Sequence, residues 1–282
     1  MLFTSYSGFC ADLSSRGPAY AAAHARALGY TSVEPLGSYT ASTPLFRMYP
    51  AQEMREALAA EGLHVPCVSV YTHLLAVDEE TLYADFDGYI AYAAALGSPY
   101  LHHTLLPGPR NADSPAYEEV LPLVVSRAER IAKMAAEAGL CCLYEPQGRY
   151  FNGEEGLGRF FSEMSRRCPG VGICGDFGNS LFADWDPVAF LRVYGGEVRH
   201  VHIKDYRVSD TPLSGAMRSL SGRYLTDALP GEGDIDLATC LRLVGEGGYR
   251  GPVSLEFSAD DAATRRAMAY CEELANQCKG ER

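Results

Sequence analysis

The sequence predicts an α/β fold, a (β/α)8 TIM barrel formed as a single domain by residues 1–282. Short apolar segments alternate with Ala-rich helical stretches from one end of the chain to the other. Eight such units in 282 residues, with no break in composition, match the size of a closed parallel barrel. The alternative is an open doubly wound sheet. That fold usually has fewer units and a glycine fingerprint after its first strand, which Ser7-Gly8-Phe9 does not match.

The strands of this barrel are expected wherever a short apolar run follows a helical stretch. A strand whose two faces are both buried consists of such a run of apolar residues. In chain order, the expected strands are 2–8, 30–36, 65–71, 100–106, 140–145, 171–176, 198–204 and 252–257.

The helices follow the strands, and several of them end at a glycine, which readily adopts the left-handed conformation that ends a helix. Asp186 and Pro187 are typical of a helix start. The segment 206–233, after strand seven, is too long for a routine connection and is expected to form a lid or substrate loop. The expected helices are 18–28, 51–60, 79–96, 117–138, 153–167, 186–194, 236–244 and 262–278.

Composition and charge argue against several classes of protein. A net charge of -12 disfavours broad contact with nucleic acid, because such binders usually carry a basic face. The nine cysteines form no CxxC motif and are expected to be reduced, as in a cytoplasmic protein. The N-terminal MLFTSYSGFC does not resemble a signal peptide, and no apolar run reaches the ~18 residues of a membrane span.

Four ligand-type side chains lie at the ends of strands five to eight. Because strand side chains alternate between faces, His202 shares one face with Lys204. Glu145, Asp176 and Glu256 end three other strands. The carboxyl ends of barrel strands meet at one face, so His202 and the three carboxylates are expected to converge, and such a set suits a divalent cation. The alternative is that each one is an ordinary polar group at a strand end.

Five motifs, in this order, resemble the xylose isomerase-like barrel superfamily. The likeness is greatest to its sugar isomerase and epimerase branch, which includes tagatose/psicose 3-epimerases, inositol-catabolism enzymes and hydroxypyruvate isomerases. The resemblance implies one divalent metal ion, Mn²⁺, Co²⁺, Mg²⁺ or Zn²⁺, held by Glu145, Asp176, His202 and Glu256. The motifs are LYEP (143–146), GDFGN (175–179), HVHIKD (200–205), LPGEGDID (229–236) and SLEF (254–257).

The resemblance implies an isomerase or epimerase that acts on a sugar, a sugar phosphate or a keto-polyol. Glu145 and Glu256 are the expected catalytic pair: one removes the proton beside the carbonyl group and the other returns a proton. The cation neutralises the charge of the cis-enediolate between these steps. Return to the neighbouring carbon gives isomerisation, whereas return to the opposite face of the same carbon gives epimerisation, and both outcomes stay open.

Six further residues are candidates for substrate contact. Asn179 occupies the position where the resembled epimerases commonly have a histidine, which leaves the exact reaction open. Arg207 is the nearest candidate for an expected arginine, although a solvated loop charge explains it as well. Lys204 could orient a substrate oxygen or form a salt bridge. The full set is Asn179, Arg207, Lys204, His103, His73 and Glu34.

Three other functions are weighed against isomerisation. A dehydratase of the inosose or dehydroshikimate type could use the same barrel and metal, because the same enolate can expel a hydroxyl group. An apurinic endonuclease would need several more histidines, and residues 206–235 contain none. A non-catalytic sugar-binding barrel would not need all four ligand types. Related barrels often form dimers or tetramers, so a homodimer or homotetramer is compatible with the resemblance.

Overall fold

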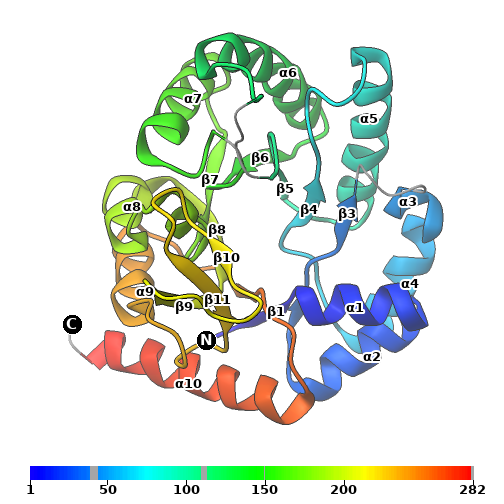
Figure 1. Ribbon diagram of the computed structural model, residues 1–282. Helices are drawn as coiled ribbons and strands as arrows, with labels where there is room; N and C mark the ends of the chain where they lie inside the picture. The colour runs from blue at the N-terminus through cyan, green and yellow to red at the C-terminus, as the bar shows by residue number, and fades with distance from the viewer. Residues whose placement is uncertain (39–43, 109–112, 149, 281–282) are drawn as a thin grey trace.

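Parallel strands form a central ring that is surrounded by helices (Figure 1). The computed structural model describes residues 1–38, 44–108, 113–148 and 150–280. The neighbouring strands run in the order β2-β1-β12-β8-β7-β6-β5-β4-β3. Their bounds are β1 (Phe3–Ser5), β2 (Ser32–Val33), β3 (Leu36–Ser38), β4 (Val68–Tyr71), β5 (Tyr100–His103), β6 (Cys141–Tyr144), β7 (Gly172–Asp176), β8 (Val198–Ile203) and β12 (Val253–Leu255).

The second barrel strand is broken into β2 and β3, whereas the sequence predicts one continuous strand. The break contains Pro35, which has no backbone N–H for the strand ladder. The ring closes at this point: Ser32 forms a parallel bridge with His64, and the Val33 N–H donates to the His64 carbonyl at 3.0 Å. The Ser69 N–H donates to the Pro35 carbonyl at 3.0 Å. The expected (β/α)8 barrel is therefore confirmed.

The structure contains all eight helices that the sequence predicts. It also contains two further α-helices, α1 and α3. Because α1 follows β1 almost at once, the first strand is shorter than expected. None of the helices in the described residues combines the length and the apolar character needed to cross a membrane. The bounds are α1 (Ser7–Arg16), α2 (Pro18–Leu28), α3 (Leu45–Met48), α4 (Ala51–Glu61), α5 (Glu79–Ala95), α6 (Tyr117–Glu137), α7 (Glu154–Arg167), η1 (Asn179–Ala183), α8 (Pro187–Tyr194), η2 (Gly195–Glu197), α9 (Leu237–Glu246) and α10 (Asp261–Gly280).

The inside of the barrel differs from the layer between strands and helices. Side chains such as Val201 and Leu255 belong to the large apolar core. Inside the ring, Cys67, Leu143 and Cys174 form a small, separate apolar cluster and are fully buried. Polar and ionisable side chains fill the barrel beyond this cluster, toward the carboxyl ends of the strands. The eight cysteines whose side chains are described are all free thiols.

The insertion after β8 is a small antiparallel sheet, although the sequence predicts only a long loop. Its strands are β9 (Asp205–Ser209), β10 (Met217–Arg218) and β11 (Tyr224–Ala228), and they pair in the order β10-β11-β9. The sheet lies beside α8 and α9 (Figure 1). The short β10 pairs only through Met217 and Arg218. A strand of only two paired residues leaves too short a pattern in the sequence for β10 to be predicted.

Asp205 holds the base of this insertion. Its Oδ2 accepts hydrogen bonds from the Gly231 and Gly233 N–H groups, both at 3.0 Å. Its Oδ1 accepts from the N–H groups of Tyr206 at 2.9 Å and Ile235 at 3.2 Å. A Cβ atom at Gly233 would lie 2.1 Å from Asp205 Oδ1, so only glycine fits there. The LPGEGDID motif thus wraps around one carboxylate.

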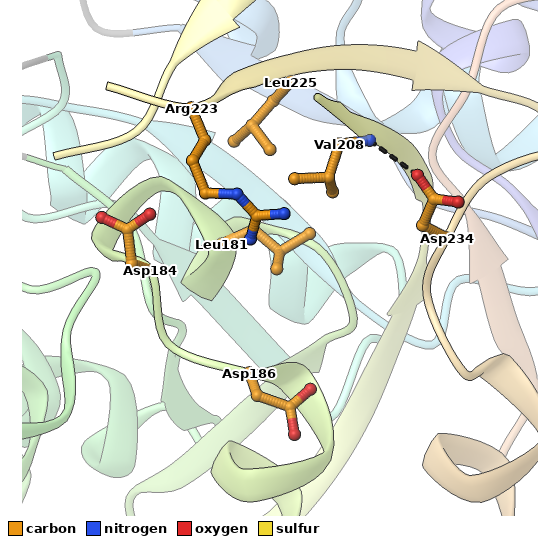
Figure 2. A pocket seen from close by; sticks show the side chains of 7 residues that line it. All are labelled: Leu181, Asp184, Asp186, Val208, Arg223, Leu225 and Asp234. Atoms are coloured by element: carbon orange, nitrogen blue, oxygen red, sulfur yellow. Dashed lines mark hydrogen bonds between the residues drawn. The ribbon is translucent and has the colours of Figure 1, made fainter. Parts of the chain in front are cut away.

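A cavity of about 360 Å³ separates the insertion from η1 and the start of α8 (Figure 2). Its three aspartates already have structural partners. Asp184 accepts from the Ser221 N–H at 2.7 Å, and Asp234 accepts from the Val208 N–H at 2.8 Å. Asp186 caps the N-terminus of α8. Asp184 and Asp234 thus anchor the insertion, whereas Asp186 fixes the start of α8. The lining residues are Leu181, Asp184, Asp186, Val208, Arg223, Leu225 and Asp234.

One histidine joins three helices from the two ends of the chain. His24 of α2 places Nδ1 2.6 Å from Asp12 Oδ2 of α1 and Nε2 3.1 Å from Asp261 Oδ1 of α10. Both ring nitrogens can donate only when the imidazole is protonated. The hydrogen bond to Asp12, and then that to Asp261, raises the pKa of His24.

We expect the substitution His24→Gln to destabilise the fold more at pH 6 than at pH 9. Because the pKa of His24 is raised in the folded state, its stabilisation is present below the unfolded pKa and is lost as pH rises through the folded value. The side chain is 25% exposed, so solvent screening limits the effect to about 0.5–1 kcal/mol. Urea denaturation at the two pH values measures it, with Arg166→Gln as the control. An equal loss of stability at both values would contradict this interpretation.

Candidate functional site

The four predicted metal ligands meet at the carboxyl ends of four neighbouring strands. His202 lies on β8, while Asp176 ends β7 and Glu145 and Glu256 directly follow β6 and β12. His202 Nδ1 lies 3.2 Å from Glu256 Oε2, 3.5 Å from Glu145 Oε2 and 3.9 Å from Asp176 Oδ2. Two ligands bound to one ion at ~2.1 Å lie roughly 3.0–3.4 Å apart. Of the possible ligand groups among the described residues, one joins His202 to Asp176 and Glu256, and another joins it to Glu145 and Cys174. Glu145 would have to approach Asp176 and Glu256 for all four groups to bind one cation.

Three buried atoms of the cluster make no hydrogen bond and would fit a divalent cation, although Asp176 Oδ2 forms an ion pair with Lys204 and His202 Nδ1 forms one with Glu256. Glu145 Oε2, Asp176 Oδ2 and His202 Nδ1 are buried and make no hydrogen bond. Buried polar atoms normally have a hydrogen-bond partner or a metal ion. Three carboxylates and one imidazole are a donor set for Mg²⁺, Mn²⁺, Co²⁺ or Zn²⁺. The side chain of Glu256 is 25% exposed, compared with 4% for Glu145, so the cluster opens to solvent beside Glu256.

The GDFGN motif sets the orientation of Asp176. Its Oδ1 accepts from the N–H groups of Gly178 at 2.8 Å and Asn179 at 2.6 Å, which turns Oδ2 toward His202. A Cβ atom at Gly178 would lie 2.6 Å from Lys204 Cγ, so glycine is needed for the lysine to reach the site. Sequence and local packing thus place Asp176 and Lys204 together.

The Lys204 ammonium lies among the carboxylates. Its Nζ is 2.8 Å from Glu256 Oε1, 3.1 Å from Asn179 Oδ1 and 3.2 Å from Asp176 Oδ2. Burial raises the pKa of Glu145 above its usual value. Burial also opposes ionisation of Glu256, but Lys204 and His202 hold the pKa of Glu256 well below its usual range. The two glutamates therefore have different electrostatic environments.

A fourth carboxylate, Glu34, lies deeper in the barrel and orients His202. Its Oε1 accepts from His202 Nε2 at 3.0 Å and from the Ser69 hydroxyl at 2.5 Å. Its Oε2 contacts His200 Nε2 at 2.7 Å and accepts from the Ser254 hydroxyl. Burial opposes ionisation of Glu34, but His202 and His200 hold its pKa well below the usual range. Because Nε2 of His202 faces Glu34, Nδ1 is presented to the three carboxylates.

Two aromatic rings near His202 were missed by the sequence analysis. His102 places Nε2 3.5 Å from Glu145 Oε1, and its Nδ1 is 2.9 Å from the Ser69 hydroxyl. Tyr6 stacks on His202 with ring centroids 5.0 Å apart. Tyr6 directly follows β1, within the strand that the sequence predicts, so period-two alternation could have identified it. His102 is followed in β5 by a second histidine, His103, so alternation alone does not single it out.

The six candidates for substrate contact fall in different places. Asn179 and Lys204 lie at the site. Glu34 is fully buried beneath it, so it supports His202 and does not line a pocket. His103 was expected to line the pocket, but its ring faces outward.

The ring of His103 packs edge-on against Phe86 of α5, because strand alternation turns His102 inward instead. His73 is half-buried after β4 and accepts from the Leu75 N–H at 3.2 Å through its Nδ1. Arg207 is exposed on β9, opposite Thr226. No substrate contact of His73 or Arg207 follows from these positions.

We expect Glu34→Gln to weaken the binding of Mn²⁺ by about 10–100-fold, the usual effect of losing the partner of a metal-binding histidine. The neutral amide would orient the His202 ring less firmly and would make its nitrogen less basic. Isothermal titration measures the affinity, and circular dichroism checks the fold. The control is Glu137→Gln on the exposed end of α6. Unchanged affinity in a folded Glu34→Gln protein would show that Glu34 does not support the metal site.

Among solved structures, several share the whole fold at low sequence identity. A xylose isomerase-like TIM barrel protein from Mycobacterium smegmatis in complex with magnesium has a TM-score of 0.74 and 19% identity, covering 98% of this chain and 97% of that chain. A D-allulose 3-epimerase from Methylomonas sp. has a TM-score of 0.73 and 18% identity, covering 97% and 98%. A probable 3-DHS dehydratase from Bacillus anthracis has a TM-score of 0.71 and 15% identity, covering 96% and 99%. At these identities the likeness concerns the fold alone.

Curated relatives match part of the chain, and a family model matches most of it. The inosose dehydratase of Clostridium tetani is 30% identical over 112 residues, 36% of this chain and 37% of that protein. The inosose dehydratase of Klebsiella pneumoniae is 28% identical over 171 residues, 56% of each chain. The chain thus spans about half the length of these relatives or less. The model of the xylose isomerase-like TIM barrel matches residues 22–274, and the chain therefore belongs to this family.

Proposed function

We propose that this protein is a divalent-metal-dependent enzyme that moves a proton at the carbon beside a carbonyl group, as a sugar isomerase or epimerase does. The observation that carries the proposal is the placement of Glu145 and Glu256 on either side of the β8-β7 pair. Their oxygens lie 3.5 Å and 3.2 Å from His202 Nδ1. Two carboxylates on the outer two of these four neighbouring strands can remove a proton from a substrate and return one to it.

The surrounding residues supply the other requirements of this chemistry. Lys204 and Asn179 lie at the site, where an ammonium and an amide can orient the oxygens of a hydroxylated ketone. Glu145, Asp176, His202 and Glu256 would hold Mn²⁺, Co²⁺, Mg²⁺ or Zn²⁺. When bound, such a cation stabilises the negative charge that develops on the carbonyl oxygen after proton removal.

Dehydration is the second candidate, and the sequence relatives favour it. The two curated relatives named above are inosose dehydratases, although they match about half of the chain or less. In this reaction a glutamate removes the proton beside the carbonyl, and the hydroxyl group on the next carbon accepts a proton and leaves as water. An unsaturated ketone is formed. Asn179, where the resembled epimerases commonly have a histidine, is consistent with a different outcome after the shared first step.

The shared first step is tested by exchange of a carbon-bound proton with solvent deuterium. We expect the Mn²⁺-loaded protein to catalyse this exchange in a member of a ketose and inosose panel. Glu145→Gln and Glu256→Gln are each expected to lower the rate by about 10²–10⁴-fold, because each removes a group that transfers the proton. The control is Glu137→Gln, and NMR measures the exchange. Treatment with EDTA is expected to abolish it and added Mn²⁺ to restore it.

The products separate the two candidates. An isomer or epimer of unchanged mass supports isomerisation or epimerisation, whereas a product lighter by one water supports dehydration. Mass spectrometry of the same reactions measures this. Exchange that persists in both glutamine variants would refute the assigned pair, and activity that survives complete metal removal would refute the metal requirement.

A further inference from the structure

The opposite end of the barrel contains a larger cavity than the one beside the insertion. Its volume is about 580 Å³, and it is formed by segments at the amino ends of β4, β5, β8 and β12. Because all barrel strands are parallel, this cavity lies at the face away from the metal cluster. The residues that give it chemical character are His64, Tyr100, Arg199, His200, Tyr249 and Arg250.

The charge of this cavity is opposite to that of the chain. The net charge of the protein is -12, yet the residues that line the cavity include two arginines, two histidines and no carboxylate. Backbone carbonyls hold the guanidinium groups in place: Arg199 Nη1 donates to Gly196 at 2.9 Å, and Arg250 Nη1 donates to Gly245 at 2.7 Å. Arg199 Nη2 lies 3.7 Å from the Glu197 carboxylate. A guanidinium group has five N–H donors, so each arginine keeps further N–H groups with which to bind a ligand.

The remaining wall is largely apolar and includes two aromatic rings. Tyr249 is half-buried, and its hydroxyl donates to the Pro252 carbonyl, which holds the ring. Tyr100 lies on the same cavity from the start of β5. His200, which is 1% exposed, lines the cavity and is bonded through Nε2 to Glu34 at 2.7 Å. A ligand here would therefore meet fixed positive charge and flat apolar surface together.

We propose that this cavity binds a small organic anion with a ring or another apolar part. Arg199 and Arg250 hold its phosphate or carboxylate group, and Tyr100 and Tyr249 contact the apolar part. His200 and Glu34 connect the cavity to His202, so a ligand at this end contacts the same hydrogen-bond network as the metal cluster. The proposal does not depend on the reaction proposed above.

The affinity experiment uses phenyl phosphate with the full chain after EDTA treatment, so that no metal ion competes for the probe. Isothermal titration is expected to show saturable binding that is at least tenfold tighter than that of inorganic phosphate or of phenol, because each lacks one half of the contacts. The double variant Arg199→Gln, Arg250→Gln is expected to bind phenyl phosphate at least tenfold more weakly. The matched control, Arg166→Gln on the exposed surface of α7, is expected to bind like the wild type.

A second measurement locates the ligand in the unmodified protein, since loss of both arginines removes contacts to backbone carbonyls. NMR of histidine-labelled protein is expected to show that phenyl phosphate shifts the ring signals of His64 and His200, while those of His24 stay unchanged. Binding that the double variant retains, no saturable binding, or shifts at His202 without shifts at His64 would overturn the proposal.

Discussion

The rest of the site depends on the hydrogen bonds that the buried carboxylate of Glu34 accepts. Its partners are Ser69 of β4, His200 and His202 of β8 and Ser254 of β12, so one side chain joins three strands to the broken second strand. A buried charge without such partners would be strongly unfavourable. Because Glu34 faces Nε2 of His202, the other ring nitrogen is turned toward the carboxylates. The candidate metal site therefore has a preorganised histidine.

Strand β8 and the two residues that follow it contribute side chains to two regions, because successive side chains point to opposite sides. His202 and Lys204 point into the barrel, where they meet the carboxylates at the ends of the neighbouring strands. Asp205 points the other way and binds the backbone of 231–235. The candidate site and the base of the insertion are thus built from consecutive residues. A shift of this segment by one position would disrupt both regions.

The repeating pattern was sufficient to predict the barrel, and the strand-end residues were sufficient to place Glu145, Asp176, His202 and Glu256 at the carboxyl ends of neighbouring strands. Other features needed the structure. Two adjacent histidines, His102 and His103, show no contrast in polarity that would reveal which one faces inward. The break at residues 34–35 contains Pro35, which the sequence analysis placed inside a continuous strand, and α1 begins at Ser7, where the first strand was expected to continue. The partners of Glu34 lie on strands far away in the chain, so no local pattern indicates them.

The first strand of the barrel pairs with the last, β1 with β12. The Ser254 hydroxyl that binds Glu34 lies 220 residues further along the chain. During synthesis on the ribosome, the glutamate therefore emerges long before its final donor. A barrel that lacks its last strand would enclose an incompletely compensated charge, which favours cooperative folding once the whole chain is available over gradual closure from the N-terminus.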